Sequence, residues 1–375
     1  MLKNFIESLA GLIKFIKLNY EEKEFVFYSE SRFYRNYYID LILNLKKINQ
    51  NNIVLVTSDK SDLEYFKNEI KCIYINNFYI LNYFFKILNC KFMIMTLTDL
   101  GNVFQKSKLC KYYVYFFHAL ASTHQIYTNL AFKNYDIVLT NGEYQSVELK
   151  LTEKKFNYPK KEIINSGYMF LDNLRIRANL NSRDSRHVLF SPSWNYNKEN
   201  LFDDYGIDII SNLLSENFKV TLRPHPEHYK RSINNINKIE KLFINNHNFN
   251  LDKNFTNLKS LEKSEIIITD NSSIVFEYMF IFKRPIVYVD YREKIHNTDR
   301  EEIDIPTIDE EFKLIFGNII KAKNLNNLPE LCNKLLVNTN ISNQMVETFA
   351  KKYLSNIGNS AFFAANYLAK KSKSD

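Results

Sequence analysis

The sequence predicts an α/β protein of two units, each built on a parallel sheet covered by helices on both faces. Three observations support this prediction. Short apolar runs of strand length alternate along the chain with longer stretches of helical periodicity. A polar and charged interval, RANLNSRDSR, divides them into two series near residue 180. The chain has 375 residues, enough for two domains of ordinary size, each with its own core.

The first series contains seven candidate strands. They are apolar at nearly every position, which is typical of parallel strands buried on both faces. Helical patterns separate several of them, for example over residues 37–48 and 79–88. The candidate strands are EFVFYS from Glu24, NIVLVTS from Asn52, KCIYIN from Lys71, KFMIMTL from Lys91, YYVYFF from Tyr112, YDIVLT from Tyr135 and EIINSG from Glu162.

The second series predicts a second sheet. We therefore expect an N-terminal lobe over residues 1–180, a C-terminal lobe over 187–340, and C-terminal helices with a solvated tail over 341–375. Two such lobes that face each other form a cleft lined by the carboxyl ends of both sheets, where open α/β sheets bind ligands. The strands are HVLFS from His187, FKVTL from Phe218, SEIIITD from Ser264 and RPIVYVD from Arg284.

Residues 1–18 have the pattern of an amphipathic helix. Its polar positions include three lysines. The pattern fits a helix that lies on an anionic membrane, and it fits equally a helix that packs against a core. Both interpretations stay open at this point. The apolar residues at helical spacing are Phe5, Ile6, Leu9, Leu12, Ile13 and Ile16.

Composition narrows the class of protein. Hydrophobic residues make up 45% and charged residues 25%, which is typical of a globular chain. The formal net charge of +8 favours anionic partners, but no basic helix or zinc-finger spacing indicates nucleic acid. The four cysteines have no CxxC spacing, so we predict reduced thiols and no metal site. Without a signal pattern or a membrane-spanning run, we expect a cytoplasmic protein.

The segment YVYFFHALASTHQIY places a histidine directly after an apolar strand. His118 therefore lies at the carboxyl end of this strand, where an imidazole can accept a proton from an attacking hydroxyl near neutral pH. His124 follows six residues later, at the start of a helix or in its loop. Either histidine can instead be a core residue whose ring nitrogens bond to the backbone.

The segment VLFSPSW ends another strand with small polar residues and a ring. Pro192 ends the strand, and Ser191 and Ser193 offer hydroxyls and free amides beside it. Trp194 is the single tryptophan of the chain. It can form the wall of a pocket for a base or sugar, or it can be a packing residue.

The segment LRPHPEHYK holds a cation and a titratable ring rigidly after a strand. Pro224 and Pro226 restrict the backbone on both sides of His225, and Arg223 precedes them. This arrangement indicates a site for an anion. The alternative is an ordinary turn between a strand and a helix with two exposed polar residues.

The segment IIITDNSSIVFEYMF predicts a strand that ends at Asp270 and a helix that begins at Ser272 or Ser273. A serine there can simply cap the helix. A helix N-terminus that points into a cleft is also a phosphate site, because its backbone N–H groups lack partners. Glu277, one turn into the helix, can accept hydrogen bonds from ribose hydroxyls.

Five motifs in this order resemble the CDP-glycerol glycerophosphotransferase family, which primes and polymerises teichoic acids and related capsules. The resemblance covers residues 112–290. It implies a GT-B fold with C-terminal helices that cross back, a CDP-polyol donor, and attack by a hydroxyl of a polymer or lipid-linked acceptor that releases CMP. The motifs are HALASTHQIY…AFKNYDIVLTNGEYQ, INSGYMFLD, VLFSPSW, LRPHP and TDNSSIVFEY.

The resemblance also implies roles for single residues. His118 matches the general base, His225 is the second catalytic histidine, and Arg223 contacts phosphate with it. The remaining candidates for nucleotide and phosphate binding are Ser191, Pro192, Asp270, Ser272, Ser273 and Glu277, with His124, Asp172 and Trp194 as further candidates. No cofactor is required, although a divalent cation bridging the donor phosphates stays open. The protein is expected at the inner face of the cell membrane, and its oligomeric state is not indicated.

Four positions depart from the family pattern. Ala119 replaces a glycine, Met169 and Phe170 replace a Pro-Arg pair, and Asn195 replaces an arginine. The donor can therefore carry ribitol or another polyol in place of glycerol. Two other enzyme classes stay open, a GT-B glycosyltransferase that uses a CMP- or UDP-sugar in capsule or lipopolysaccharide synthesis and a relative of UDP-GlcNAc 2-epimerase. A binding protein without turnover is a further alternative.

Overall fold

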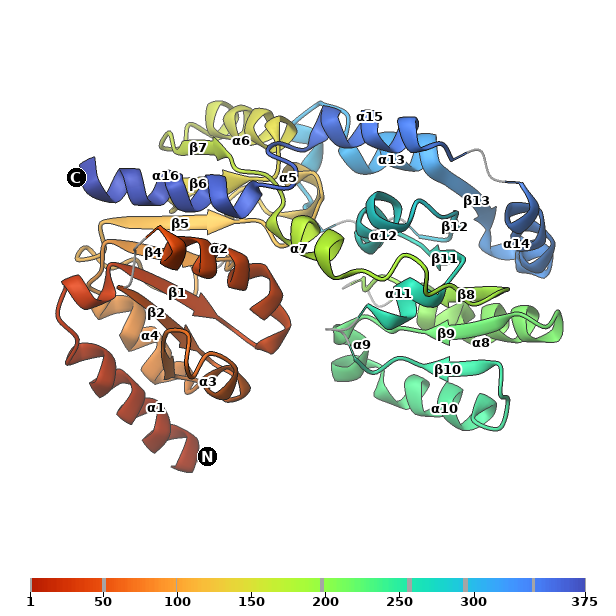
Figure 1. The fold of residues 1–375 in the computed structure, drawn as a ribbon, viewed down its shortest axis with the longest axis horizontal. Helices are drawn as coiled ribbons and strands as arrows, with labels where there is room; N and C mark the ends of the chain where they lie inside the picture. Colours follow the sequence, from red (N-terminus) through yellow and green to blue (C-terminus); the bar gives the residue numbers. More distant parts are fainter. Residues whose placement is uncertain are drawn as a thin grey trace. The chain divides into compact units, whose positions relative to one another are not determined.

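The computed structural model describes residues 2–48, 52–98, 100–195, 199–254, 258–292, 296–338 and 341–374. Backbone contacts divide the chain into two compact units (Figure 1). Each unit contains one sheet, in which all paired strands are parallel. The predicted architecture of two parallel-sheet α/β lobes is thereby confirmed. Unit 1 comprises Met1–Asn173, Asp299–Ile305 and Tyr353–Asp375, and unit 2 comprises Leu174–Thr298 and Pro306–Lys352.

The sheet of unit 1 has the strand order β3-β2-β1-β4-β5-β6-β7. Strands β1 to β3 follow one another toward one edge of the sheet, and strands β4 to β7 follow one another toward the other edge. The strand order therefore reverses between β1 and β4, which lie side by side. Open α/β sheets bind their ligands at such a point. The strands are β1 (Phe25–Ser29), β2 (Ile53–Thr57), β3 (Lys71–Tyr74), β4 (Phe92–Met95), β5 (Tyr112–Phe116), β6 (Ile137–Thr140) and β7 (Glu162–Asn165).

Helices cover both faces of this sheet, which explains why its central strands are buried at every position. Val26 and Tyr28 of β1 face a core that includes α1 (Leu2–Ile16) and α4 (Phe78–Ile87). Phe25 and Phe27 point the other way, toward α2 (Arg35–Lys47) and α16 (Ser360–Ser374). Alternate residues of one strand thus fill two cores, as the side-chain period of a strand requires.

The last helix of the chain belongs to the first unit. α16 packs beside α2 through a small-residue face (Figure 1), in which Ala364, Ala365 and Leu368 are fully buried. The Asp172 carboxylate accepts hydrogen bonds from the backbone N–H groups of Gly358 at 2.7 Å and Ser360 at 2.9 Å. It therefore caps the start of α16. The prediction that the C-terminal helices cross back is confirmed for α16.

The sheet of unit 2 repeats the same topology, with the order β10-β9-β8-β11-β12-β13. Helices α8, α10 and α14 share a core with one of its faces. The sequence prediction missed β10 and β13. Strand β10 has only three residues, and both strands carry polar residues. The strands are β8 (His187–Phe190), β9 (Lys219–Leu222), β10 (Phe249–Leu251), β11 (Ile266–Thr269), β12 (Ile286–Asp290) and β13 (Gly317–Lys321).

The remaining elements connect and cover the strands. In unit 1 the helices are α3 (Ser61–Tyr65), α5 (Thr123–Ile126), α6 (Glu143–Phe156) and α7 (Met169–Arg177), which runs on into unit 2. In unit 2 they are α8 (Leu201–Ser215), α9 (Pro226–Arg231), α10 (Ile233–Phe243), α11 (Lys259–Lys263), α12 (Ile274–Phe282), α13 (Ile308–Phe316), α14 (Leu328–Val337) and α15 (Asn343–Tyr353). The 3-10 turns are η1 (Glu21–Lys23), η2 (Arg32–Tyr34), η3 (Arg300–Glu302) and η4 (Ala322–Asn327).

Helix α1 has one packed face and one exposed apolar face. Leu12 and Phe15 are buried, and Gly11 approaches β3 so closely that a Cβ atom would lie 2.1 Å from the Tyr74 carbonyl oxygen. Among the described residues, no helix is both long and apolar enough to cross a bilayer. The interpretation of α1 as a packed helix therefore holds for one face only. The exposed apolar residues are Leu2, Phe5, Ile6, Leu9, Ile13 and Ile16.

Replacing Gly167 by alanine tests how tightly the C-terminal segment closes on unit 1. Gly167 has φ +95°, and an added Cβ atom would lie 2.2 Å from the Ser355 carbonyl oxygen. Left-handed strain and this clash together are expected to cost about 3 kcal/mol. Gly358→Ala is the control, because its φ is +83° but nothing lies within 4 Å of the added atom. We expect a clearly larger fall in the urea midpoint for Gly167→Ala, measured by circular dichroism; equal falls would contradict the close approach.

Candidate functional site

In the sheet of unit 2, β8 and β11 are neighbours at the point where the strand order reverses, and a polar loop follows the carboxyl end of each of them. Asp270, directly after β11, joins the two loops. Its Oδ1 accepts a hydrogen bond from the Ser193 N–H at 2.7 Å, and its Oδ2 accepts one from the Ser193 hydroxyl at 2.8 Å. Thr269 donates to the Ser191 carbonyl at 2.7 Å. The Asp270 carboxylate therefore shapes the loop in which the sequence placed its nucleotide site.

The residues of the Ser-Pro-Ser-Trp loop are buried. The Ser191 hydroxyl faces the Arg223 carbonyl at 3.5 Å, and Pro192 is buried beside it. The Trp194 side chain is only 6% exposed, and its ring meets the His228 ring edge-on at 4.9 Å between centroids. This contact favours the packing interpretation of Trp194. Binding of a nucleotide by Ser191 and Pro192 stays a prediction.

Arg223 follows β9 and is 8% exposed. Its backbone N–H donates to the Phe190 carbonyl of β8. The guanidinium donates to the Ser260 hydroxyl at 2.9 Å and lies 3.6 Å from the Asp252 carboxylate. Both partners orient the Arg223 fork inside unit 2. Its predicted role as a phosphate contact stays a prediction, and in that role Asp252 would compete with the phosphate for the same cation.

His225 and His228 form a histidine pair at the start of α9. The His225 N–H donates to the His228 Nδ1 at 3.1 Å, and the Glu227 N–H donates to the His225 Nδ1 at 3.2 Å. Each neutral ring therefore carries its proton on Nε2, because Nδ1 acts as the acceptor. His225 is half-buried. The pair acts as a capping box in which histidines replace the usual serine and glutamate.

The sequence prediction missed His228. It is fully buried, and burial lowers the pKa of its ring to about 4. It contacts the rings of Trp194 and Phe202. The signal that would have found it is the spacing His-x-x-His across a strand-to-helix turn, which is the spacing of a capping box. His228 therefore fixes the backbone at His225 from inside the unit.

The start of α12 carries the two candidate serines. Ser273 is the N-cap residue, and its side chain makes no capping hydrogen bond to the described residues. Both Ser272 and Ser273 are half-buried. The N–H groups of the first turn and the positive end of the helix dipole are thus not covered by a serine cap. Glu277 lies in this first turn and is 7% exposed. The pyrophosphate and ribose roles of these residues stay predictions.

His118 lies in unit 1, at the carboxyl end of β5 as predicted. The rings of Tyr34 and Tyr37 meet its imidazole edge-on, and the Tyr168 hydroxyl donates to its carbonyl at 3.2 Å. Burial lowers the pKa of His118 to about 4, and the Nδ1 atom is buried without a hydrogen-bond partner among the described residues. The ring is therefore neutral near pH 7, which is the form that accepts a proton. Sequence reasoning did not find Tyr34 and Tyr37.

The contacts of His124 and Asp172 stabilise the fold of unit 1. His124 is 6% exposed, and its Nδ1 lies 3.6 Å from a carboxylate oxygen of Glu148 in α6. The other oxygen of Glu148 accepts hydrogen bonds from the N–H and the hydroxyl of Thr123. This arrangement holds α5 against α6 in the interior of unit 1. Asp172 caps α16, as described above. A direct role in binding stays a prediction for both.

The two predicted catalytic histidines belong to different units, His118 to unit 1 and His225 to unit 2. The prediction that both rings contact one donor stays a prediction. Within the described residues, no group of three or more histidine, cysteine, aspartate or glutamate side chains is arranged to hold a metal ion. In the part of the chain that the structure describes, all four cysteines are free thiols.

Comparisons with solved structures show the fold class. The wall teichoic acid polymerase TagF has a TM-score of 0.59 and 15% identity, with 100% of this chain and 98% of that chain covered. A second TagF structure, soaked with CDPG, has a TM-score of 0.54 at the same identity and coverage. UDP-GlcNAc 2-epimerase from Neisseria meningitidis, bound to UDP-GlcNAc, has a TM-score of 0.59 and 15% identity, with 92% and 99% covered. The predicted GT-B class is confirmed.

Sequence comparison shows the family. No curated protein is significantly similar to the chain. The family model described as CDP-glycerol:poly(glycerophosphate) glycerophosphotransferase matches residues 21–355. This match spans both units, from the turn before β1 to the segment before α16. The chain therefore belongs to the family of CDP-glycerol:poly(glycerophosphate) glycerophosphotransferases, and the family that the sequence motifs resembled is the one that the family model identifies.

Proposed function

We propose that this enzyme transfers glycerol phosphate from CDP-glycerol to a hydroxyl of a cell-surface polymer or of its lipid-linked precursor, and that it releases CMP. Family membership supports the donor class. The observation that carries the assignment of the base is the neutral imidazole of His118 at the carboxyl end of β5, a half-buried residue whose ring packs against Tyr34. An imidazole in this state accepts a proton from a hydroxyl without first losing one of its own.

The proposed reaction is an in-line displacement at the phosphorus that carries glycerol. The acceptor oxygen forms a bond to this phosphorus, and the bond from phosphorus to the oxygen of CMP breaks. The hydroxyl proton passes to His118, and CMP leaves as the phosphate monoester. Phosphoryl transfer depends on positioning and charge neutralisation more than on covalent catalysis. In this proposal the base is assigned to unit 1 and the donor contacts are assigned to unit 2.

Unit 2 supplies the groups that neutralise the donor phosphates in this mechanism. The His225 Nε2–H donates to a phosphate oxygen, because its Nδ1 already accepts from the Glu227 N–H. The start of α12 donates the backbone N–H groups of Ser273 and Ile274, because those of Val275 and Phe276 already bond to the Ser272 and Ser273 carbonyls. Arg223 adds a fixed cation. These groups complete the mechanism without a resident cofactor, and a divalent cation that bridges the donor phosphates is the alternative.

The second candidate function is transfer of a sugar from a nucleotide sugar, or epimerisation of one. The similarity in fold to UDP-GlcNAc 2-epimerase is the observation that supports this second candidate. Incubation with CDP-glycerol, CDP-ribitol, CMP-sugars and UDP-sugars separates the candidates. CMP released from a CDP-polyol supports the proposal. Turnover of sugar nucleotides alone would contradict it.

Replacing the two catalytic candidates tests the proposed roles. His118→Ala and His225→Ala are each expected to lower the rate of CMP release from CDP-glycerol by about 100-fold or more, because a positioned acid–base or phosphate-binding group is lost. His247→Ala is the matched control, since this histidine is exposed between α10 and β10. Addition of EDTA to the wild type tests the bridging cation. An unchanged rate in either catalytic variant would refute the role assigned to that residue.

The low pKa of His118 predicts that the reaction rate falls only at an unusually low pH. The base must be neutral, so activity is lost as the pH falls through its pKa. With a pKa of about 4, roughly nine-tenths of His118 is still neutral at pH 5, against about 3% for an ordinary ring. We expect kcat to stay nearly constant from pH 7 to pH 5. A steep fall near pH 6.5 would show that a solvated histidine is the base.

We also propose that the enzyme works at the inner face of the cell membrane and that α1 and α4 bind the lipid surface. The two helices contact each other, and both expose apolar side chains. The aromatic residues Phe78, Tyr79 and Tyr83 of α4 are 57%, 78% and 53% exposed. Lysines flank this surface on both helices, which suits anionic headgroups. The basic residues are Lys3, Lys14, Lys17 and Lys86.

Charged substitutions on this surface test the membrane proposal. Ile6→Asp combined with Ile13→Asp is expected to weaken binding to phosphatidylglycerol-containing vesicles by about tenfold or more, because both side chains are exposed and point away from the core. Leu314→Asp is the control, since Leu314 is 84% exposed on α13 of unit 2. Co-sedimentation with anionic and with purely zwitterionic vesicles gives the comparison. Undiminished binding of the double variant would exclude this surface.

A further inference from the structure

The ring of His118 lies inside an aromatic collar made by Tyr34 and Tyr37. The ring centroids of Tyr34 and Tyr37 lie 5.4 and 5.9 Å from that of His118, at interplanar angles of 87° and 78°. Tyr37 in turn packs on Phe170 at 4.4 Å between centroids. The two tyrosines follow β1, whereas His118 follows β5, and β4 lies between these strands. The collar thus joins segments that are far apart in the sequence.

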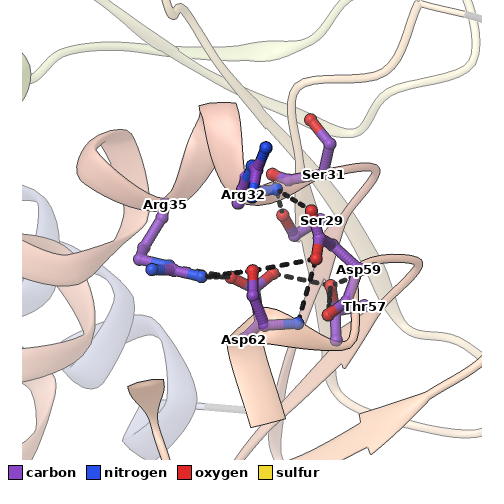
Figure 2. A network of polar contacts seen from close by, with 8 residues as sticks. Ser29, Ser31, Arg32, Arg35, Thr57, Asp59 and Asp62 are labelled. Atoms are coloured by element: carbon purple, nitrogen blue, oxygen red, sulfur yellow. Dashed lines mark hydrogen bonds and ion pairs between the residues drawn. The ribbon is translucent and has the colours of Figure 1, made fainter. Parts of the chain in front are cut away.

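An ion pair between a half-buried arginine and a buried aspartate holds the segment that bears both tyrosines. Arg35, which lies between them in the sequence, donates from Nε to the Asp62 Oδ1 at 2.8 Å, and its Nη2 lies 2.7 Å from the same oxygen (Figure 2). The Arg35 Nη2 also donates to the Ser61 hydroxyl at 2.9 Å. The guanidinium lies over the Tyr65 ring at 4.1 Å. Arg35 is therefore fixed on several sides.

The acceptors of this network belong to the loop after β2. The second oxygen of Asp62 accepts a hydrogen bond from the Thr57 hydroxyl at 2.6 Å, at the last residue of β2. Asp59 accepts from the Arg32 N–H at 3.0 Å (Figure 2). It also accepts from the Ser61 N–H at 2.9 Å. The loop after β1 is thereby tied to the loop after β2. The first turn of α2 has little freedom to rotate or lift.

Stability alone does not explain this ion pair well. The Asp62 side chain is 1% exposed, and removing a carboxylate from water costs several kcal/mol that an ion pair often only offsets. An apolar contact of the same size would stabilise the loops equally well. What the pair adds is directional geometry, because a guanidinium and a carboxylate fit in one orientation. The residues held in that orientation are the ones that enclose His118.

We propose that Arg35 and Asp62 are positioning residues for the transfer reaction, because they hold Tyr34 and Tyr37 against His118. The inference rests on the proposed role of His118 as the base. The collar excludes water from one side of the imidazole and restricts the ring to one orientation. Among the described residues, the rings of Tyr34 and Tyr37 pack on the imidazole and the Tyr168 hydroxyl donates to the His118 carbonyl. The lowered pKa of His118 is caused by burial of the ring.

A histidine titration measured by NMR on the full chain tests the collar without any substrate. We expect His118 to titrate near pH 4 in the wild type, and at least about one pH unit higher in Arg35→Met and in Tyr37→Leu, because water then reaches the ring. Lys46→Met is the matched control. It breaks the exposed Lys46–Glu69 pair on the same helix, and we expect no shift.

Kinetics provide the second measurement. We expect both variants to lower kcat at least tenfold and to leave KM for CDP-glycerol unchanged, because the donor contacts are assigned to unit 2. Arg35→Lys keeps the charge without the fork and is expected to recover only part of kcat. If Arg35→Met does not fold, the His118 titration and kcat of Tyr37→Leu test the inference.

An unchanged His118 titration in folded Tyr37→Leu would overturn the inference. The proposed function fails separately, if His118→Ala keeps its transfer rate.

Discussion

Parallel strands impose the constraint on which the rest of this structure depends. Each strand must return through a crossover before the next begins, so all strands of a sheet end at the same edge. In unit 2 the loops that carry Ser193, His225 and Asp270 therefore collect at one edge, although 77 residues separate the two partners of the Ser193–Asp270 hydrogen bond. In unit 1 the same rule brings His118 next to tyrosines that follow β1. The chemistry of the molecule is a consequence of this convergence.

Two histidines packed against aromatic rings are the second theme. His118 and His228 both have a pKa lowered to about 4 by burial, and both are enclosed by aromatic rings. Their roles differ because their nitrogens differ. The Nδ1 of His228 is occupied by the backbone of His225, whereas the Nδ1 of His118 has no partner among the described residues. One ring therefore shapes a turn, and the other keeps the capacity to take up a proton.

Sequence patterns predicted most of the strands, including some that carry charged or polar residues at their ends. All seven strands of unit 1 and β8, β9, β11 and β12 of unit 2 fall within the expected segments. Strands β10 and β13 were missed because Asn250, Asn318 and Lys321 interrupt their apolar pattern, and only pairing with a neighbouring strand reveals them. Tyr34 and Tyr37 were missed for a similar reason. They resemble ordinary residues of an amphipathic helix until the fold places them beside His118.

The return of α16 to unit 1 has a consequence for how the protein is made. The face of α2 that contains Leu41 and Leu45 is covered by α16, which follows the whole of unit 2 in the sequence and is therefore synthesised after it. The whole of unit 2 has thus been synthesised when unit 1 still lacks helix α16. The apolar face of α2 therefore stays exposed until α16 has been synthesised, after all the strands of unit 2.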